Sequence, residues 1–181
     1  KQAFHHIHLA CGSGRLEEAN ELLNEVFSRG QRNERALRWF FEELRENGHA
    51  RLALEVARRI ADDMARAGNA AAALDVCEWA CKMEPGFVLS GAAATLTMAR
   101  AAATTGRYSL ATALLEPFPA MFADGAERGA AAMLDARICA EHTGDSTRAR
   151  EQLDWLAENV PAIVQSEEYS RVARLVGRSL G

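Results

Sequence analysis

Three histidines and a cysteine near the start of the sequence are of types that can bind a metal. His5, His6 and His8 are followed by Cys11, and on a helix His5, His8 and Cys11 would share one face. A structural zinc site needs four convergent ligands, and no second cluster in the sequence supplies the fourth. We therefore predict no metal site and interpret the histidines as part of an N-terminal helix, with zinc binding as the alternative.

The other reactive side chains match no catalytic motif. The sequence contains no glycine-rich phosphate loop, no His-Glu-x-x-His pattern and no nucleophile elbow. Adjacent carboxylates such as Asp62 and Asp63 point in different directions on a helix, which is typical of a solvated face. Four cysteines lie in apolar helical patterns that favour buried, reduced thiols over a disulfide framework: Cys11, Cys77, Cys81 and Cys139. We predict that the protein is not an enzyme and needs no cofactor.

Composition and charge favour a helical protein that does not bind nucleic acid. Of the 181 residues, 49% are hydrophobic and 25% are charged, which is the balance of a folded globular chain. Alanine is abundant, whereas strand-forming β-branched and aromatic residues are sparse, so we expect helices and no strands. The net charge of −4 argues against phosphate backbones as partners. No apolar run reaches the roughly 20 residues of a transmembrane helix, so we expect no membrane insertion of this segment.

A spacing of glycine and alanine recurs along the sequence and divides it into repeats. In the clearest unit, Gly68 is followed by Ala73, then by Cys77 and Ala80, and Pro85 closes the unit. The glycine ends one helix, and the small residue lets the next helix approach closely. The same glycine–alanine pair recurs at four other places: Gly14 with Ala19, Gly48 with Ala53, Gly106 with Ala111, and Gly144 with Ala149.

This arrangement resembles the tetratricopeptide repeat (TPR), whose usual unit has about 34 residues. Gly14 and Gly48 stand 34 residues apart, whereas Gly68, Gly106 and Gly144 follow one another at intervals of 38. The resemblance implies an all-α fold, a right-handed α-solenoid of antiparallel helix pairs. Gly48 and Gly68 are only 20 residues apart, so one helix must serve two hairpins. Which helices line the inner surface is therefore left open.

The periodic apolar positions and the end signals predict about ten helices in a single TPR-like domain over residues 1–181. Because the sequence begins with Lys1 and not with methionine, we expect it to be a piece of a longer chain. The expected helices span residues 2–11, 15–28, 33–46, 50–66, 70–83, 88–104, 108–122, 126–142, 146–159 and 164–179.

The expected partner site lies on the inward helix of each repeat, because solenoids hold partners on one concave surface made by alternate helices. Such a surface would be half apolar and of mixed charge here, which suits an amphipathic helix or an extended peptide with carboxylates for the arginines. The alternative is that these residues are ordinary solvated or core-edge positions. They are Arg58, Asp62, Arg66, Leu96, Arg100, Leu134, Ile138 and Glu141.

A second expected contact is the aromatic run Trp39, Phe40 and Phe41. Three consecutive residues on a helix of 3.6 residues per turn cannot all face one core, so at least one should lie on another face. Aromatic side chains are enriched at the centres of protein interfaces. We predict a partner or subunit contact here, with burial on two sides of a middle helix as the alternative.

These features together predict a protein–protein interaction scaffold. The resemblance and an arginine- and alanine-rich composition typical of bacteria favour a cytoplasmic part of a membrane-associated secretion or polysaccharide-export complex, tethered to the inner membrane through a segment outside this sequence. The alternatives are a soluble secretion-type chaperone and a ligand-sensing regulatory repeat domain, with an enzyme third. A homo-oligomer is left open.

Overall fold

A computed structural model describes residues 2–28 and 34–179, and every regular element within these ranges is helical. The all-α prediction is therefore confirmed. The first residue of the predicted helix 33–46 lies outside the described residues, as do both ends of the predicted domain 1–181. The α-helices are α1 (Gln2–Gly12), α2 (Leu16–Ser28), α3 (Glu34–Glu46), α4 (Ala50–Arg66), α5 (Leu74–Met83), α6 (Ala92–Thr104), α7 (Tyr108–Leu115), α8 (Phe118–Met121), α9 (Arg128–Ile138), α10 (Ser146–Asn159) and α11 (Glu167–Ser179).

The chain divides into two compact units, unit 1 (Lys1–Ile60) and unit 2 (Ala61–Gly181), and the division falls within α4. In unit 1, α1 packs against α2. The ring of Phe4 on α1 lies 5.4 Å from that of Phe40 on α3, so α3 shares the same core. The large side chains that are almost fully buried in this unit are Ile7, Leu23, Phe40, Phe41, Leu44 and Ile60.

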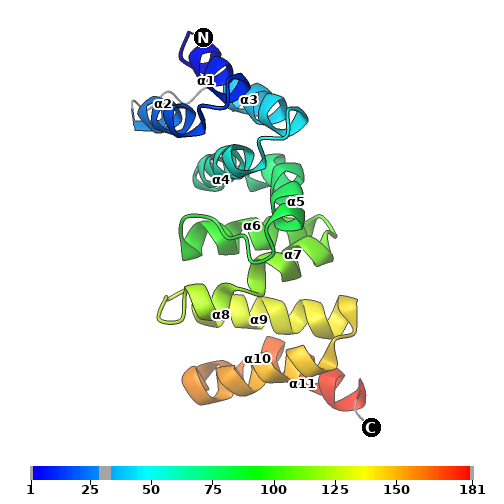
Figure 1. Cartoon of the computed structure of the whole chain (residues 1–181). Helices are drawn as coiled ribbons and strands as arrows, with labels where there is room; N and C mark the ends of the chain where they lie inside the picture. Colours follow the sequence, from blue (N-terminus) through cyan, green and yellow to red (C-terminus); the bar gives the residue numbers. More distant parts are fainter. Residues whose placement is uncertain (1, 29–33, 180–181) are drawn as a thin grey trace. The chain divides into compact units, whose positions relative to one another are not determined.

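Unit 2 is a series of helical hairpins. Helix α6 packs against α7, and α9 packs against α10, while both α6 and α7 also contact α9 (Figure 1). The last helix, α11, packs on α10 and reaches α9. Alanines on α9 and α10 let these helices approach closely, because a small side chain leaves room for the neighbouring backbone. The core around them consists of Ala132, Met133, Ala136, Cys139, Ala149, Leu153, Leu156, Val172 and Val176.

The repeat spacing appears in the structure as a recurring helix end. The five repeat glycines have φ angles from 73° to 77°, which is the left-handed region that favours glycine. At Gly106, the next amide, that of Arg107, donates to the carbonyl of Ala102 and so closes the end of α6. The alanine five residues after each glycine has no exposed surface, as predicted for a position of close helix approach: Ala19, Ala53, Ala73, Ala111 and Ala149.

Several helices differ from their predicted bounds. The predicted helix 108–122 is broken, since α7 ends at Leu115 and α8 begins after Pro117. Proline has no amide hydrogen to donate within a helix, which explains the break. The predicted helix 70–83 begins as a 3₁₀ turn (Ala70–Ala73), and the predicted helix 126–142 ends in a π turn (Cys139–Thr143).

The predicted helix 88–104 begins only at Ala92 because the preceding segment is held by α4. The Asp62 carboxylate accepts one hydrogen bond from the Ser90 amide, at 3.1 Å, and another from the Ser90 hydroxyl. This amide is therefore committed to a partner outside α6. The last predicted helix, 164–179, is shortened in the same way by a 3₁₀ turn (Pro161–Gln165) before α11.

Candidate partner-binding groove

The eight residues predicted to line a partner surface divide into two groups, because the structure buries four of them. Leu96, Leu134 and Ile138 are only 3%, 5% and 1% exposed, because α6 and α9 are covered by neighbouring helices on both sides. Asp62 is 3% exposed and is occupied by Ser90, so it cannot pair with a partner without losing those hydrogen bonds. Leu96, Leu134 and Ile138 therefore support the surface from beneath and contribute little exposed area to it.

The remaining predicted residues are at least partly accessible. Arg100 and Arg66 are exposed, and Arg58 is half-buried in unit 1. Arg66 lies 3.4 Å from Asp63 and 4.0 Å from Asp62, so α4 ends in a local ion-pair cluster. In unit 2, Arg100 and Leu134 of the predicted set line the same hollow.

That hollow, which we call groove A, is a cavity of about 480 Å³ over α6, α9 and α11. Its rim carries Arg100 and Thr104 from α6, and Leu134 forms part of its wall. The groove thus crosses α6, α9 and α11 together with the 3₁₀ turn that carries Ile163, and the chain passes through α7 and α8, and then α10, between these helices. The other lining residues are Ala130, Met133, Arg137, Ile163 and Glu168.

A second hollow, groove B, has a volume of about 740 Å³ and adjoins groove A. The two share Arg137 and Glu168, whose side chains form an ion pair of 2.9 Å between Nη1 and Oε1. This pair therefore stands at the boundary between the grooves. Arg171 in groove B pairs with Glu141 at 3.2 Å, which places the last predicted residue beside the groove and not inside it. The rest of groove B is lined by Gln165, Glu167, Ser170 and Arg174.

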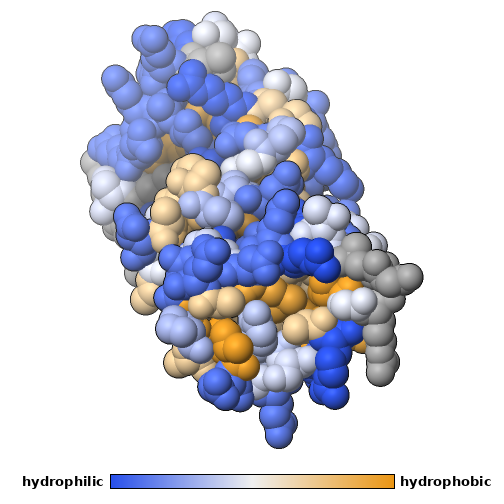
Figure 2. Space-filling view, turned by 90° about the horizontal axis from the view of Figure 1, so that it is seen from below, coloured by the Kyte–Doolittle hydropathy of each residue, from blue (hydrophilic) through white to orange (hydrophobic). Residues whose placement is uncertain are grey.

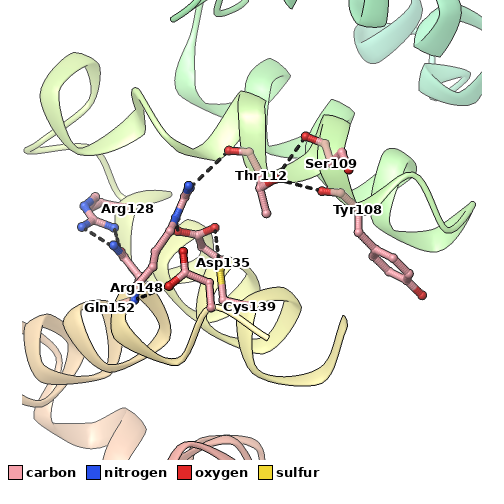
Figure 3. A network of polar contacts seen from close by, with 9 residues as sticks. Tyr108, Ser109, Thr112, Arg128, Asp135, Cys139, Arg148 and Gln152 are labelled. Carbon is pink, nitrogen blue, oxygen red and sulfur yellow. Dashed lines mark hydrogen bonds and ion pairs between the residues drawn. The ribbon is translucent and has the colours of Figure 1, made fainter. Parts of the chain in front are cut away.

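A buried polar network fixes α9 from behind the grooves (Figure 3). Asp135 on α9 is 3% exposed, and its carboxylate accepts a hydrogen bond of 2.8 Å from Nε of Arg148 on α10. The same guanidinium donates to the carbonyl oxygen of Thr112 on α7, at 3.2 Å. One arginine thus ties three helices together, and it sets the position of the helix that forms the floor of groove A.

Burial dominates the protonation chemistry of this network. It raises the pKa of Asp135, and the hydrogen bond and charge of Arg148 offset only part of that effect. Burial also raises the pKa of the neighbouring Cys139 to about 11, with the charge of Asp135 acting in the same direction. The thiol is therefore protonated at neutral pH, and it donates a weak hydrogen bond of 3.8 Å to Asp135.

A second buried cation lies at the start of α9. Arg128 is 5% exposed, its guanidinium carbon lies 4.0 Å from the centre of the Trp155 ring, and it donates to Gln152. Burial lowers the pKa of Arg128. Sequence reasoning missed Arg128, Asp135 and Arg148. The available signal was Asp135 between apolar residues of α9, whereas nothing in the polar sequence of α10 distinguishes Arg148. Figure 2, which looks onto the side of unit 2 formed by α10 and α11, shows apolar surface bordered by hydrophilic side chains.

The aromatic run in unit 1 separates as geometry requires. Phe40 and Phe41 are 0% and 2% exposed, whereas Trp39 is 51% exposed, so the expectation that one ring faces away from the core is confirmed. A partner contact at Trp39 stays a prediction.

Among the N-terminal residues, Cys11 is buried, His5 and His6 are exposed, and His8 lies 4.0 Å from Glu43. Within the described ranges, no three metal-binding side chains converge.

The thiols in α5 are poor nucleophiles. Burial raises the pKa of Cys77 to about 12 and that of Cys81 to about 11. Both are therefore thiols at neutral pH, and the thiolate, which is the nucleophile, is scarce. Over the described part of the chain, none of the helices combines the length and the apolar character that a bilayer crossing requires.

Comparison of the chain with models of protein families, with curated proteins and with solved structures gave no match. The function must therefore be argued from the grooves themselves.

Proposed function

We propose that this chain is a TPR-like α-solenoid that serves as a protein-interaction module, and that grooves A and B of unit 2 hold a segment of the partner. The observation that carries the proposal is groove A, which is lined by α6, α9 and α11. One helix of each hairpin, α6 and α9, lines the groove together with the last helix, and the concave surfaces of helical solenoids are also made by one helix from each repeat.

The lining of groove A suits a peptide better than a reacting small molecule. Met133 and Leu134 are almost fully buried and form its apolar bottom, the half-buried Ile163 can contact a side chain of the partner, and the polar rim can pair with a backbone or with charges. Groove A together with groove B offers an extended track. The buried groups of unusual pKa, Asp135 and Cys139, belong to the packing of α9 and line neither hollow.

The proposal is tested by closing groove A without changing its charge. Peptides are selected from a displayed random library on the wild-type protein, and their affinities are then measured by fluorescence anisotropy. We expect Thr104→Trp, an exposed position on the rim, to weaken binding about tenfold or more because the indole fills the groove. The matched control is Ala157→Trp, which places the same side chain at an exposed position of α10 outside both grooves.

Two results would count against the proposal. Selection on the wild-type protein could yield no binding peptide, or the selected peptides could bind the wild type and both variants equally. The helix content and thermal midpoint of each variant are compared by circular dichroism, so that a loss of binding is not confused with unfolding.

A further inference from the structure

We infer that grooves A and B select an acidic peptide segment, in which one carboxylate binds Arg100 and another takes the place of Glu168 on Arg137. This inference rests on the proposed function and names the chemistry of its ligand. It adds a specific role for the Arg137–Glu168 ion pair, as an internal contact that the ligand replaces.

The charge of the two grooves is opposite to that of the chain. The lining has a charge of +2, or +1 when Glu141 beside Arg171 is included, while the whole chain carries −4. The charged lining residues are Arg100, Arg137, Arg171, Arg174, Glu167 and Glu168. A positive groove attracts an acidic segment, while the net negative charge of the whole chain opposes its binding where such local charge is absent. Charge complementarity therefore identifies the class of ligand.

Arg100 is the cation most available to such a ligand. It is exposed on the rim of groove A, and its guanidinium makes no hydrogen bond or ion pair with the residues that the structure describes. The guanidinium fork matches a carboxylate in geometry, so a bidentate contact is open to the first acidic side chain of the ligand. Arg171 and Arg174, by contrast, already contact Glu141 and the Ser170 carbonyl.

Arg137 is the second cation, and Glu168 occupies it in the free protein. Their side chains are 37% and 41% exposed, so the ion pair lies in contact with water at the boundary between the grooves. An exposed pair of this kind is weak and can be replaced by another carboxylate at small cost. A ligand that replaces Glu168 would also join groove A to groove B and continue along both.

The same lining does not favour a nucleic acid. Proteins that hold single strands combine cations with aromatic rings on which the bases stack. Among the described residues, neither groove is lined by an aromatic side chain. Apolar walls made by Met133, Leu134 and Ile163 instead suit an aliphatic side chain between the acidic ones.

The test uses two short labelled peptides, one of Leu-Glu-Glu repeats and one of Leu-Gln-Gln repeats, with affinities measured by anisotropy. We expect the wild type to bind the glutamate peptide more tightly. Arg100→Gln should weaken that binding about 5-fold, and Glu168→Gln should strengthen it about 2- to 5-fold, because the competing carboxylate is removed. Neither change should alter binding of the glutamine peptide. The control is Arg150→Gln, an exposed arginine of α10 that lines neither groove.

The gain in Glu168→Gln cannot result from misfolding, so it keeps the test decisive even if another variant unfolds. The inference is overturned if the two peptides bind equally, if Arg150→Gln weakens binding as much as Arg100→Gln, or if a single-stranded oligonucleotide binds more tightly than the glutamate peptide. If both peptides bind equally but Thr104→Trp blocks them, the proposed function stands and the charge selection falls. If library selection also yields no binding peptide, both the proposed function and the charge selection are rejected.

Discussion

Replacing Asp135 by alanine is the perturbation whose effect on stability can be worked out most fully. The change removes the carboxylate that accepts from Arg148 at 2.8 Å and leaves a guanidinium that is only 22% exposed in its side chain. Removing one partner of a buried ion pair costs about 3–5 kcal/mol. Arg148 keeps its hydrogen bond to the Thr112 carbonyl and some contact with water, so we expect the lower end, about 3 kcal/mol.

The assay is urea unfolding of the whole chain. Trp39 and Trp79 are replaced by phenylalanine, so that the fluorescence of Trp155 reports the unfolding of unit 2. In thermal unfolding, the same loss corresponds to a fall in Tm of about 6–12 °C for a chain of this size. The decisive comparison is the double variant Asp135→Leu with Arg148→Met. Replacing both charges by apolar side chains should restore stability to within about 1 kcal/mol of the wild type.

The pH dependence of the same site has a defined sign. Because burial raises the pKa of Asp135 in the folded state, the native protein binds this proton more tightly than the unfolded chain does. The proton-linked part of the stability is therefore present below the ordinary pKa of 3.8 and is lost as the pH rises through the raised value, whereas the ion pair with Arg148 contributes once the carboxyl is ionised. We expect the stability advantage of the wild type over Asp135→Asn to grow as the solution is acidified from neutral pH.

If Asp135→Ala costs less than about 1 kcal/mol, or if the double variant is no better than the single one, the network is not the support of α9 that we describe.

The remaining predictions concern stability in other parts of the chain. Phe40→Ala should cost about 3–5 kcal/mol because the ring is fully buried, whereas Trp39→Ala should lie within about 0.5 kcal/mol of the wild type because half of its ring faces solvent; equal losses in denaturant unfolding would contradict this contrast. Gly144→Ala should destabilise by about 1–2 kcal/mol because its φ is 74°, while Gly177→Ala, inside α11 with no described atom within 4 Å of the added carbon, should stabilise by up to about 1 kcal/mol in thermal unfolding.

The helix ends could be predicted from the sequence because their causes are local. A left-handed turn requires glycine, and close helix approach requires a small residue, so Gly106 and Ala111 carry their own signal. The burial of Leu96 and Leu134 could not be predicted in this way. An apolar residue on a helix that is covered on two sides looks the same in sequence as one that lines a groove, and only the packing of neighbouring helices distinguishes them.

The polar network escaped sequence reasoning for a related reason. Asp135 and Arg148 are 13 residues apart and lie on different helices, so no helical spacing connects them. The delayed start of α6 has the same origin, because the bond from Ser90 to Asp62 spans 28 residues. Interactions of this kind depend on which helices become neighbours, whereas helix ends depend on a few adjacent residues.

The ion pair between Arg137 and Glu168 also has a kinetic consequence. An exposed pair contributes about 0.2–1 kcal/mol, which is comparable with thermal energy, and exposed side chains change rotamer within picoseconds to nanoseconds. For a ligand of the kind inferred above, the boundary between the grooves would therefore open many times during a single encounter, and arrival would not be slowed. When a bound carboxylate released Arg137, Glu168 would be the first group to recapture the guanidinium. On that inference, the pair would set the residence time of an acidic ligand rather than its access.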